Sequence, residues 1–340
     1  MDHVPFVSVI IPTYNRADSL RRTLASLAEQ TYPPERFEVI VVDDGSTDET
    51  QAISGERYPY HFVYQHQETR GEIVARNLGA DLAKGDMLVF LDDDIEVNPL
   101  YIESLVRTHK ANPRSVVIGT LIEIPFERKH NLPQNDGKFS TLLDQKQLSE
   151  PEEITFVGCM SGILSISRDG FFKVGRMQPL IVGDGHNIWG GMDFGYRAYQ
   201  CGFSFWRARD ALAYHHDHII ASLELRCRRY YRVSHDVHHL FTKYPALRGQ
   251  IPMFRDKTPI SWRNDPLRLI VRKLLRALTA WRPVLWSMEQ VAHLLERFAP
   301  WPMALRLLYR WIVSSYIYRG YRQGLREYGG PPPVAGRGVA

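Results

Sequence analysis

The 340-residue sequence contains few cysteines and no long hydrophobic run. Its three cysteines are scattered and form no Cys-x-x-Cys pair, which disfavours a disulfide scaffold or a zinc ribbon and favours a reducing compartment. No uncharged apolar segment approaches the roughly 20 residues that span a bilayer, and the amino terminus has no signal-peptide pattern. These absences predict a cytoplasmic protein, and the hydrophobic content of 44% predicts a folded one.

Glycine-rich phosphate-binding motifs are also missing. No G-x-G-x-x-G follows the first apolar run, and no G-x-x-x-x-G-K-[ST] occurs anywhere in the chain. The first turn instead reads PTYNR, residues 12–16. If a nucleoside diphosphate binds, another group must neutralise it, and a metal held by Asp92–Asp94 is the available candidate.

The first half of the chain alternates between buried strands and helices. Continuous apolar runs predict parallel strands at 7–12, 38–44 and 87–94. Helical spacing predicts helices at 18–30, 71–85 and 99–111. Ser46 and Glu49 have capping-box spacing for a further helix, and Gly85 is expected to be the C-cap of the helix before it. This alternation predicts an α/β fold with a mostly parallel, doubly wound sheet.

Two of these strands run into aspartates at their carboxyl ends, VVDD at 41–44 and FLDDD at 90–94. One acidic strand end alone could be a turn or a helix cap. Ligands of doubly wound sheets bind beyond the carboxyl ends of the strands, so two acidic ends on one rim indicate a divalent metal that offsets their repulsion. Without that metal, the pKa values of the three aspartates at 92–94 should be raised.

The middle of the chain is less regular. Residues 125–153 are polar and proline-containing, which predicts a long surface loop or lid. A strand at 163–168 follows, and then a helix within 189–203 that Gly202 ends. Asp193 would lie in the first turn of that helix, where the helix dipole favours a carboxylate. A short strand from residue 211 then ends in histidines.

Five segments in this order resemble the family 2 glycosyltransferases of the GT-A fold. The segments are PTYNR, VVDDGSTDET, ARNLGADLAKGD, FLDDDIEV and WGGMDFGYR, and the resemblance covers roughly residues 5–220. It implies a Rossmann-like GT-A domain, a nucleotide-sugar donor, a divalent metal (Mg²⁺ or Mn²⁺), and sugar transfer with inversion at the anomeric carbon. The chain lacks a Q-x-x-R-W motif, so it resembles non-processive members.

The resemblance also implies roles for residues that would bind the nucleotide. Pro12 and Tyr14 would line the base pocket, and Asp44 would hydrogen-bond the base. Arg76, or Arg70 nearby, would face the nucleotide as well.

The D-x-D motif of the family matches Asp92-Asp93-Asp94. Asp94 would ligate the metal, and Asp92 or Asp93 would help to hold the metal or the ribose. His215 matches a position where some members place a further metal or diphosphate contact. Asp193 matches the catalytic base, which would take the proton from the attacking acceptor hydroxyl.

One departure keeps other functions open. Members commonly carry Glu-Asp where this chain has Met192-Asp193, so Asp193 could be a mere helix N-cap. The alternatives are a non-catalytic GT-A protein that binds a nucleotide or glycan, and a nucleotidyltransferase, which would release pyrophosphate.

The histidines permit two interpretations. His215, His216 and His218 could form a zinc site, with His235, His238 and His239 on one helix face. No cysteine or acidic partner at zinc spacing supports this, so structural or surface roles are favoured for all of them except His215.

The C-terminal quarter differs chemically from the rest. Residues 260–330 hold twelve Lys/Arg against four Asp/Glu, and five of the seven tryptophans. Apolar stripes at helical spacing predict amphipathic helices, which suit an anionic membrane surface, a cap on the catalytic domain or a dimer interface. No recognition motif supports nucleic-acid binding.

We therefore expect three regions. Residues 1–220 would be the catalytic domain, 221–328 a basic, aromatic-rich helical extension, and 329–340 a disordered tail. The expected activity is glycosyl transfer to a glycan or lipid-linked acceptor in cell-surface polysaccharide or glycolipid synthesis. The expected location is the cytoplasm, peripherally on the cytosolic face of the membrane.

Overall fold

The computed structural model describes residues 4–123, 149–180, 189–215, 222–298 and 302–328. The described residues up to His215 form one compact unit, and those from Ser222 onward form a second. Most of the predicted loop at 125–153, the predicted boundary at 220, His216, His218 and the predicted tail lie outside the described residues.

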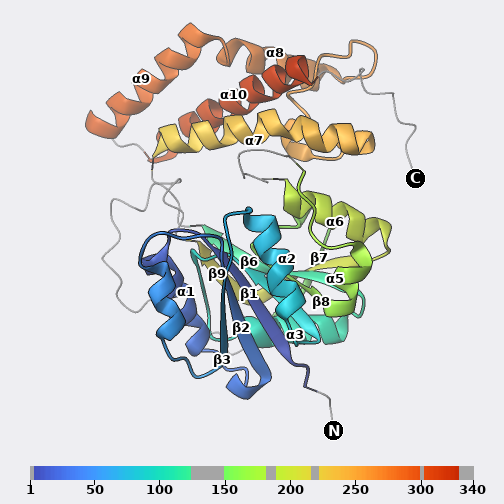
Figure 1. The fold of residues 1–340 in the computed structure, drawn as a ribbon. Helices are drawn as coiled ribbons and strands as arrows, with labels where there is room; N and C mark the ends of the chain where they lie inside the picture. Colours follow the sequence, from blue (N-terminus) through green and yellow to red (C-terminus); the bar gives the residue numbers. More distant parts are fainter. Residues whose placement is uncertain (1–3, 124–148, 181–188, 216–221, 299–301, 329–340) are drawn as a thin grey trace. The chain divides into compact units, whose positions relative to one another are not determined.

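The first unit is built on a mixed β-sheet (Figure 1). Its amino-terminal half is parallel, with β1 (Val7–Thr13) between β2 (Phe37–Asp43) and β4 (Met87–Leu91), and β3 (His61–His66) outside β2. All residues of β1, β2 and β4 are buried, which explains why their sequences are mostly apolar. These strands confirm the predicted α/β fold.

The second half of the sheet adds antiparallel pairs. β8 (Ile163–Ser167) runs antiparallel to β4 and to β6 (Ser115–Glu123). β6 pairs in parallel with β9 (Ser204–His215), which starts earlier than the sequence predicts. Two short strands, β5 (Ile95–Val97) and β7 (Glu152–Ile154), also pair with β9. The β5–β9 pair is important for the site, because it joins segments far apart in the sequence.

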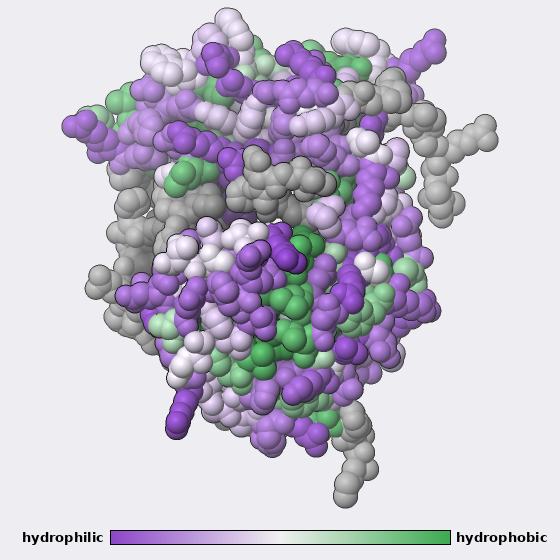
Figure 2. Space-filling model, in the orientation of Figure 1, coloured by the Kyte–Doolittle hydropathy of each residue, from purple (hydrophilic) through white to green (hydrophobic). Residues whose placement is uncertain are grey.

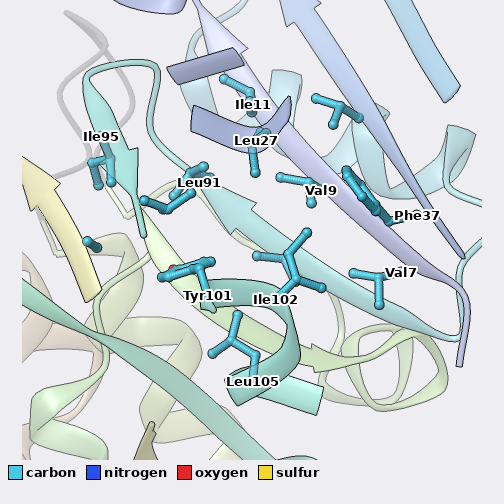
Figure 3. Packing of buried hydrophobic residues seen from close by; sticks show 14 of the residues in the cluster. Val7, Val9, Ile11, Leu27, Phe37, Leu91, Ile95, Tyr101, Ile102 and Leu105 are labelled. Atoms are coloured by element: carbon cyan, nitrogen blue, oxygen red, sulfur yellow. The ribbon is translucent and has the colours of Figure 1, made fainter. Parts of the chain in front are cut away.

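Helices cover both faces of this sheet, as in a doubly wound fold. The side chains of Val7, Val9 and Ile11 point to a core shared with α1 (Ala17–Ala28) and α3 (Tyr101–Ala111), as Figure 3 shows. On the other face, Gly79 of α2 (Glu72–Leu82) lies against Ile10. The other helices among the described residues of the unit are α5 (Arg168–Val174), α6 (Gly190–Gln200), and the 3₁₀ turns η1 (Pro34–Arg36), η2 (Glu49–Gly55) and η4 (Phe156–Gly158).

Several predicted helix ends are wrong. The segment after β2 is a 3₁₀ helix whose N-cap is Asp48, while the Ser46 hydroxyl accepts a hydrogen bond from the Asn15 amide instead. Helix α2 ends at Leu82, and Gly85 is not its C-cap. A glycine is needed at 85 because a Cβ there would lie 2.6 Å from the Ser8 amide nitrogen.

The second unit is helical. It contains α7 (Leu223–Lys243), α8 (Leu267–Thr279), α9 (Arg282–Phe298), α10 (Pro302–Glu327) and the short turns η6 (Pro245–Gly249) and η7 (Pro252–Phe254). α7 and α10 approach closely, since a Cβ at Gly320 would meet the Tyr231 carbonyl oxygen at 2.1 Å. Among the described helices, none is both long and apolar enough to cross a membrane.

The histidines of α7 make structural contacts within this unit. The buried His238 ring lies 2.9 Å from the Tyr321 carbonyl oxygen of α10, and His235 lies between Asp236 and Glu327. Within the described parts of the chain, no group of three or more His, Cys, Asp or Glu side chains could hold a metal. The contacts of His235 and His238 agree with the favoured structural role.

Candidate functional site

The two acidic strand ends flank the end of β1, as the sequence predicts. Thr13 stands opposite Asp43 of β2 in the strand register. Its hydroxyl donates a 2.7 Å hydrogen bond to Asp93, which follows β4. The carboxyl ends of the three central strands therefore meet at one rim, and Thr13 links them.

The aspartates of the first acidic end have structural partners. The Asp43 carboxylate accepts hydrogen bonds from the Ser46 amide and the Tyr64 hydroxyl, and it lies 2.9 Å from His66. Burial opposes ionisation of Asp43, but its hydrogen bonds to Ser46, His66 and Tyr64 outweigh burial and lower its pKa. These contacts account for Asp43 as a turn residue, which is one of the roles that the sequence permits for an acidic strand end.

Asp44 anchors the loop that leads into α2. One carboxylate oxygen accepts hydrogen bonds from the Gln67 side chain at 2.6 Å and the Arg70 amide at 2.8 Å, and the other accepts from the Gly71 amide at 2.8 Å. Gly71 has a positive φ of 93°, which favours glycine there. The expected contact between Asp44 and a nucleotide base stays a prediction.

The turn after β1 leaves Tyr14 exposed beside the buried Pro12. Asn15, at φ 52°, fixes this turn because its side-chain oxygen accepts hydrogen bonds from the Thr47 and Asp48 amides. An exposed aromatic ring on a fixed turn is suited to stacking on a base. The anchoring by Asn15 was missed from the sequence, although asparagine is among the few residue types that tolerate positive φ.

Asp92 is held by a buried arginine. Arg76, on α2, has no exposed surface and forms ion pairs with Asp92 and with Glu72. Burial raises the pKa of Asp92, and the charge of Arg76 opposes that rise. The structure therefore places Arg76 against Asp92, and the predicted contact of Arg76 with a nucleotide stays a prediction.

Asp93 is the next carboxylate along the turn. It accepts the hydrogen bond from Thr13, and its other oxygen lies 3.1 Å from Arg16. Burial raises the pKa of Asp93 to about 7, against the opposing effects of Arg16 and Thr13.

Asp94 lies between two cationic or potentially cationic groups. One of its carboxylate oxygens lies 2.8 Å from the Arg16 guanidinium, and the other, Oδ1, lies 3.2 Å from His215 Nε2. Burial opposes ionisation, but His215 and Arg16 outweigh it and lower the pKa of Asp94. The expectation of raised pKa values is therefore wrong for Asp94 and confirmed for its two neighbours.

Strand pairing explains why His215 reaches Asp94. Ile95 of β5 stands opposite His215 at the end of β9. The residue before Ile95 is thereby brought to the histidine. Two predicted metal ligands thus meet in the structure, while the third, Asp92, is directed to Arg76.

The Asp94–His215 pair fits half of a divalent-metal site. Asp94 Oδ1 is buried and makes no hydrogen bond of good geometry. Two ligands at right angles around Mg²⁺ or Mn²⁺, each about 2.1 Å from the ion, are about 3 Å apart. In the structure, Asp94 Oδ1 and His215 Nε2 lie 3.2 Å apart. Such ions are commonly held by one or two protein ligands together with substrate phosphates, so a cluster of three is not required.

Asp193 occupies the first turn of α6, as predicted. It has no exposed surface, and its carboxylate lies 2.9 Å from Arg197 one turn later. Arg197 also donates hydrogen bonds to the carbonyl oxygens of Val174 and Arg176. The Asp193 carboxylate is therefore held by an arginine that two backbone carbonyl oxygens also hold in place.

A short segment, residues 159–162, packs against both the aspartate turn and α6. A Cβ at Gly162 would lie 1.9 Å from Asp92 Oδ2, and the Asp92 amide donates to the Gly162 carbonyl. A Cβ at Gly191 of α6 would lie 2.8 Å from the Ser161 amide nitrogen. Both glycines permit close approach, so this segment lies between Asp92 and the helix of Asp193. Sequence reasoning missed it, although a glycine just before a buried strand was the available signal.

Comparison with known proteins gives a consistent family. The family model described as Glycosyl transferase family 2 matches residues 8–171. Validoxylamine A glucosyltransferase from Streptomyces hygroscopicus subsp. limoneus is 31% identical over 263 residues, which cover 68% of this chain. The match spans only 57% of that protein's length.

Solved structures show the same fold at low sequence identity. The mannosyltransferase PcManGT from Pyrobaculum calidifontis, in complex with GDP-Man and Mn²⁺, has a TM-score of 0.56 at 18% identity, over 95% of this chain and 89% of that one. S. aureus TarS 1-349, in complex with UDP-GlcNAc, has a TM-score of 0.51 at 18% identity, over 94% and 92%. With its matched domain at residues 8–171 and its GT-A fold, this chain belongs to the family 2 glycosyltransferases.

Proposed function

We propose that the chain transfers a sugar from a nucleotide-diphosphate sugar to an acceptor hydroxyl, with inversion and with the help of Mg²⁺ or Mn²⁺. The pairing of Asp94 Oδ1 with His215 Nε2 at 3.2 Å, at the carboxyl end of the central strands, carries this proposal. A metal there would face the rim at which ligands of doubly wound sheets bind.

The donor would bind along this rim. Tyr14 and Pro12 would contact the base, with Asp44 as its hydrogen-bond acceptor, and Asp93 would hold the ribose. Arg16, which is about half exposed and pairs with Asp93 and Asp94, is a cation that a diphosphate could also reach. The nucleotide sugars bound by the two solved relatives, GDP-Man and UDP-GlcNAc, support this donor class.

The reaction would be a single displacement. Asp193 accepts the proton of the acceptor hydroxyl while that oxygen bonds to the anomeric carbon, and the bond to the diphosphate oxygen breaks. Arg197 keeps the carboxylate in place. A metal on Asp94 and His215 would stabilise the negative charge of the departing nucleoside diphosphate as a Lewis acid. Asp193 has no exposed surface, so acceptor binding must expose its carboxylate.

The acceptor would be a glycan or a lipid-linked glycan in cell-surface polysaccharide or glycolipid synthesis. The enzyme would work at the cytosolic face of a membrane, which it contacts through the helices of the second unit. The exposed hydrophobic and basic residues of that unit support this part of the proposal.

Two substitutions separate metal binding from catalysis. Asp94→Asn should abolish Mn²⁺ binding, measured by the electron paramagnetic resonance signal of free Mn²⁺, and with it sugar transfer. Asp193→Asn should keep Mn²⁺ and nucleotide binding but reduce transfer by about 10²-fold or more. Asp18→Asn, at a surface carboxylate of α1, is the matched control.

Two results would overturn the proposal. One is unchanged transfer by Asp193→Asn, and the other is a product that retains the donor's anomeric configuration by NMR.

Met192 favours one alternative. A buried methionine stands where family members commonly carry glutamate, which is compatible with a protein that binds a nucleotide sugar without turnover. Release of nucleoside diphosphate from the donor, dependent on Asp193, would exclude this alternative. Release of pyrophosphate would instead indicate a nucleotidyltransferase.

A further inference from the structure

Helix α8 presents its hydrophobic face to solvent. Its five most apolar exposed positions recur at helical spacing and share one face of the helix. Leu267 is 75% exposed and Leu278 is 54% exposed, although both are ordinary core residue types. The face consists of Leu267, Val271, Leu274, Leu275 and Leu278, and we call it the α8 face.

Buried ion pairs on the opposite side of α8 fix this orientation. Lys273 is buried and donates to Asp265 at 2.6 Å and to the Pro259 carbonyl at 3.0 Å. Arg276 is also buried, lies 3.1 Å from Asp256, and packs its guanidinium over the Trp311 ring at 4.2 Å.

Rotating the helix to bury its leucines would break these pairs and leave Asp256 with Lys257 as its remaining partner among those described. Breaking a buried ion pair is strongly destabilising. The outward face is therefore a fixed property of the unit.

Exposed tryptophans flank α8 in the sequence. Trp262 lies before the helix and is 74% exposed, while Trp281 and Trp286 follow it and are both more than half exposed. In the view of Figure 2, hydrophobic residues lie among hydrophilic ones where Figure 1 places α8 and α9. Tryptophan is enriched where an apolar phase meets water, because its ring is apolar and its N–H is polar.

The exposed charges around the α8 face are of one sign. Arg263, Arg268 and Arg282 are exposed in this stretch, and so is Arg272, which pairs with Asp256. From residue 257 to 295 the acidic residues are Asp265, bonded to Lys273, and Glu289, which accepts a hydrogen bond from Tyr316. The surface therefore combines leucine, tryptophan and arginine with little negative charge to balance them.

We propose that the α8 face docks on an anionic lipid surface. This proposal rests on the proposed function in that it names the surface for its membrane contact, which would bring the catalytic unit to a lipid-linked acceptor, and it does not depend on the transfer reaction. The leucines and tryptophans would enter the headgroup boundary, and the arginines would bind lipid phosphates. A second copy of the chain fits less well, because a two-fold interface would place the arginine-rich surface against itself.

The test is co-sedimentation of the full chain with lipid vesicles. The wild type should sediment with vesicles of phosphatidylglycerol and phosphatidylcholine in equal parts, and less with phosphatidylcholine alone. Leu274→Glu with Leu278→Glu should weaken vesicle binding about tenfold or more, since two leucines that would be buried in the lipid are lost. Arg268→Glu with Arg282→Glu should weaken binding about fivefold for each arginine.

Controls separate this inference from the catalytic one. Leu82→Glu, at an exposed leucine of the first unit, should bind vesicles as the wild type does. Asp193→Asn should also bind normally, because vesicle binding needs no turnover. Circular dichroism and thermal unfolding would establish that each variant is folded.

Three outcomes would overturn the inference. The wild type could stay in the supernatant with the anionic vesicles. The leucine double variant could bind them unchanged while folded. Sedimentation velocity could show a wild-type dimer that the same variant converts to a monomer without any lipid binding, which would make the α8 face an interface between copies.

Discussion

Arg16 Nη1 lies 2.8 Å from Asp94 Oδ2 and 3.1 Å from Asp93 Oδ1, so one guanidinium bridges the two carboxylates next to the proposed metal site. Arg16 therefore supplies the positive charge that this turn needs in the absence of metal. A cation that binds Asp94 must compete with it. Arg16→Gln should bind Mn²⁺ more tightly in the absence of nucleotide, by up to about fivefold, because a half-exposed pair contributes about 1 kcal/mol at most.

The measurement is a Mn²⁺ titration followed by electron paramagnetic resonance. Arg22→Gln is the matched control, since Arg22 lies on α1, the helix that follows Arg16, and its partner is Glu96, outside the aspartate turn. Weaker Mn²⁺ binding by Arg16→Gln would mean that Arg16 organises Asp94 for the metal and does not compete with it.

Gly162→Ala should damage the site without removing any functional group. The new methyl carbon would lie 1.9 Å from Asp92 Oδ2, so Asp92 must move away from its ion pair with Arg76. We expect a transfer rate reduced about 10²-fold, because small displacements of catalytic groups have effects of this size. Gly158→Ala is the control, since its nearest neighbour is the end of the flexible Ile154 side chain at 3.2 Å. Steady-state kinetics with equal activity for the two variants would contradict this account.

His109 should make the first unit less stable in mild acid. Its ring lies 2.9 Å from the Ser165 hydroxyl and 3.2 Å from that of Ser115, and burial lowers its pKa to about 4. An unfolded histidine titrates near pH 6.5, so the unfolded chain binds a proton first. The free energy of unfolding should have its full value above about pH 6.5, and it should fall by roughly 1–3 kcal/mol as the pH approaches 4.

Urea unfolding of the wild type and of His109→Gln, at about pH 6.5 and at about pH 4, tests this. The variant should lose less stability on acidification than the wild type. His61→Gln replaces a histidine whose side chain is 55% exposed, and it should lose as much stability on acidification as the wild type does. An identical pH dependence for His109→Gln and the wild type would sink the explanation.

Asp256 should be a main determinant of stability in the second unit. It pairs with Lys257, Arg272 and Arg276, and two of these are buried. Asp256→Asn should lower the free energy of unfolding by about 3–5 kcal/mol, because buried cations lose their partner. Glu224→Gln removes an exposed pair with Arg228 and should change it by about 0.5 kcal/mol or less.

Asp256 should also make the stability of the second unit depend on pH in strong acid. Burial opposes its ionisation, but Lys257 and Arg276 outweigh burial and lower the pKa of Asp256 to about 2. Its contribution is present above about pH 4, where an unfolded aspartate is ionised, and is lost as the pH falls toward 2. Thermal unfolding of the wild type and Asp256→Asn should therefore differ at pH 7 and converge in strong acid.

Strands and helices with strong periodicity could be predicted from the sequence, and their ends could not. The runs at β1, β2 and β4 are mostly apolar because both of their faces are covered. The end of α2 was missed because Gly85 is explained by its close approach to Ser8, which no local pattern shows.

The site was predictable where motif and position coincided. Asp94 and His215 were both expected to bind metal, and the structure brings them together. The partners of Asp92 and Asp94 were not predictable, because Arg76 and Arg16 reach them from other helices or turns. The outward orientation of α8 was also hidden, since a leucine stripe normally indicates a buried face and only the pairs made by Lys273 and Arg276 reverse it.

The pairing of β5 with β9 has a consequence for folding. Asp94 lies near the middle of the first unit's sequence and His215 lies at its end, so neither a newly made amino-terminal half nor a partly unfolded chain has both proposed ligands in place. Closure of such a long loop is slow relative to local helix formation. Manganese binding would therefore report completion of this unit: a chain ending before β9 should not acquire the ion, and the full chain should acquire it only in the last step of folding.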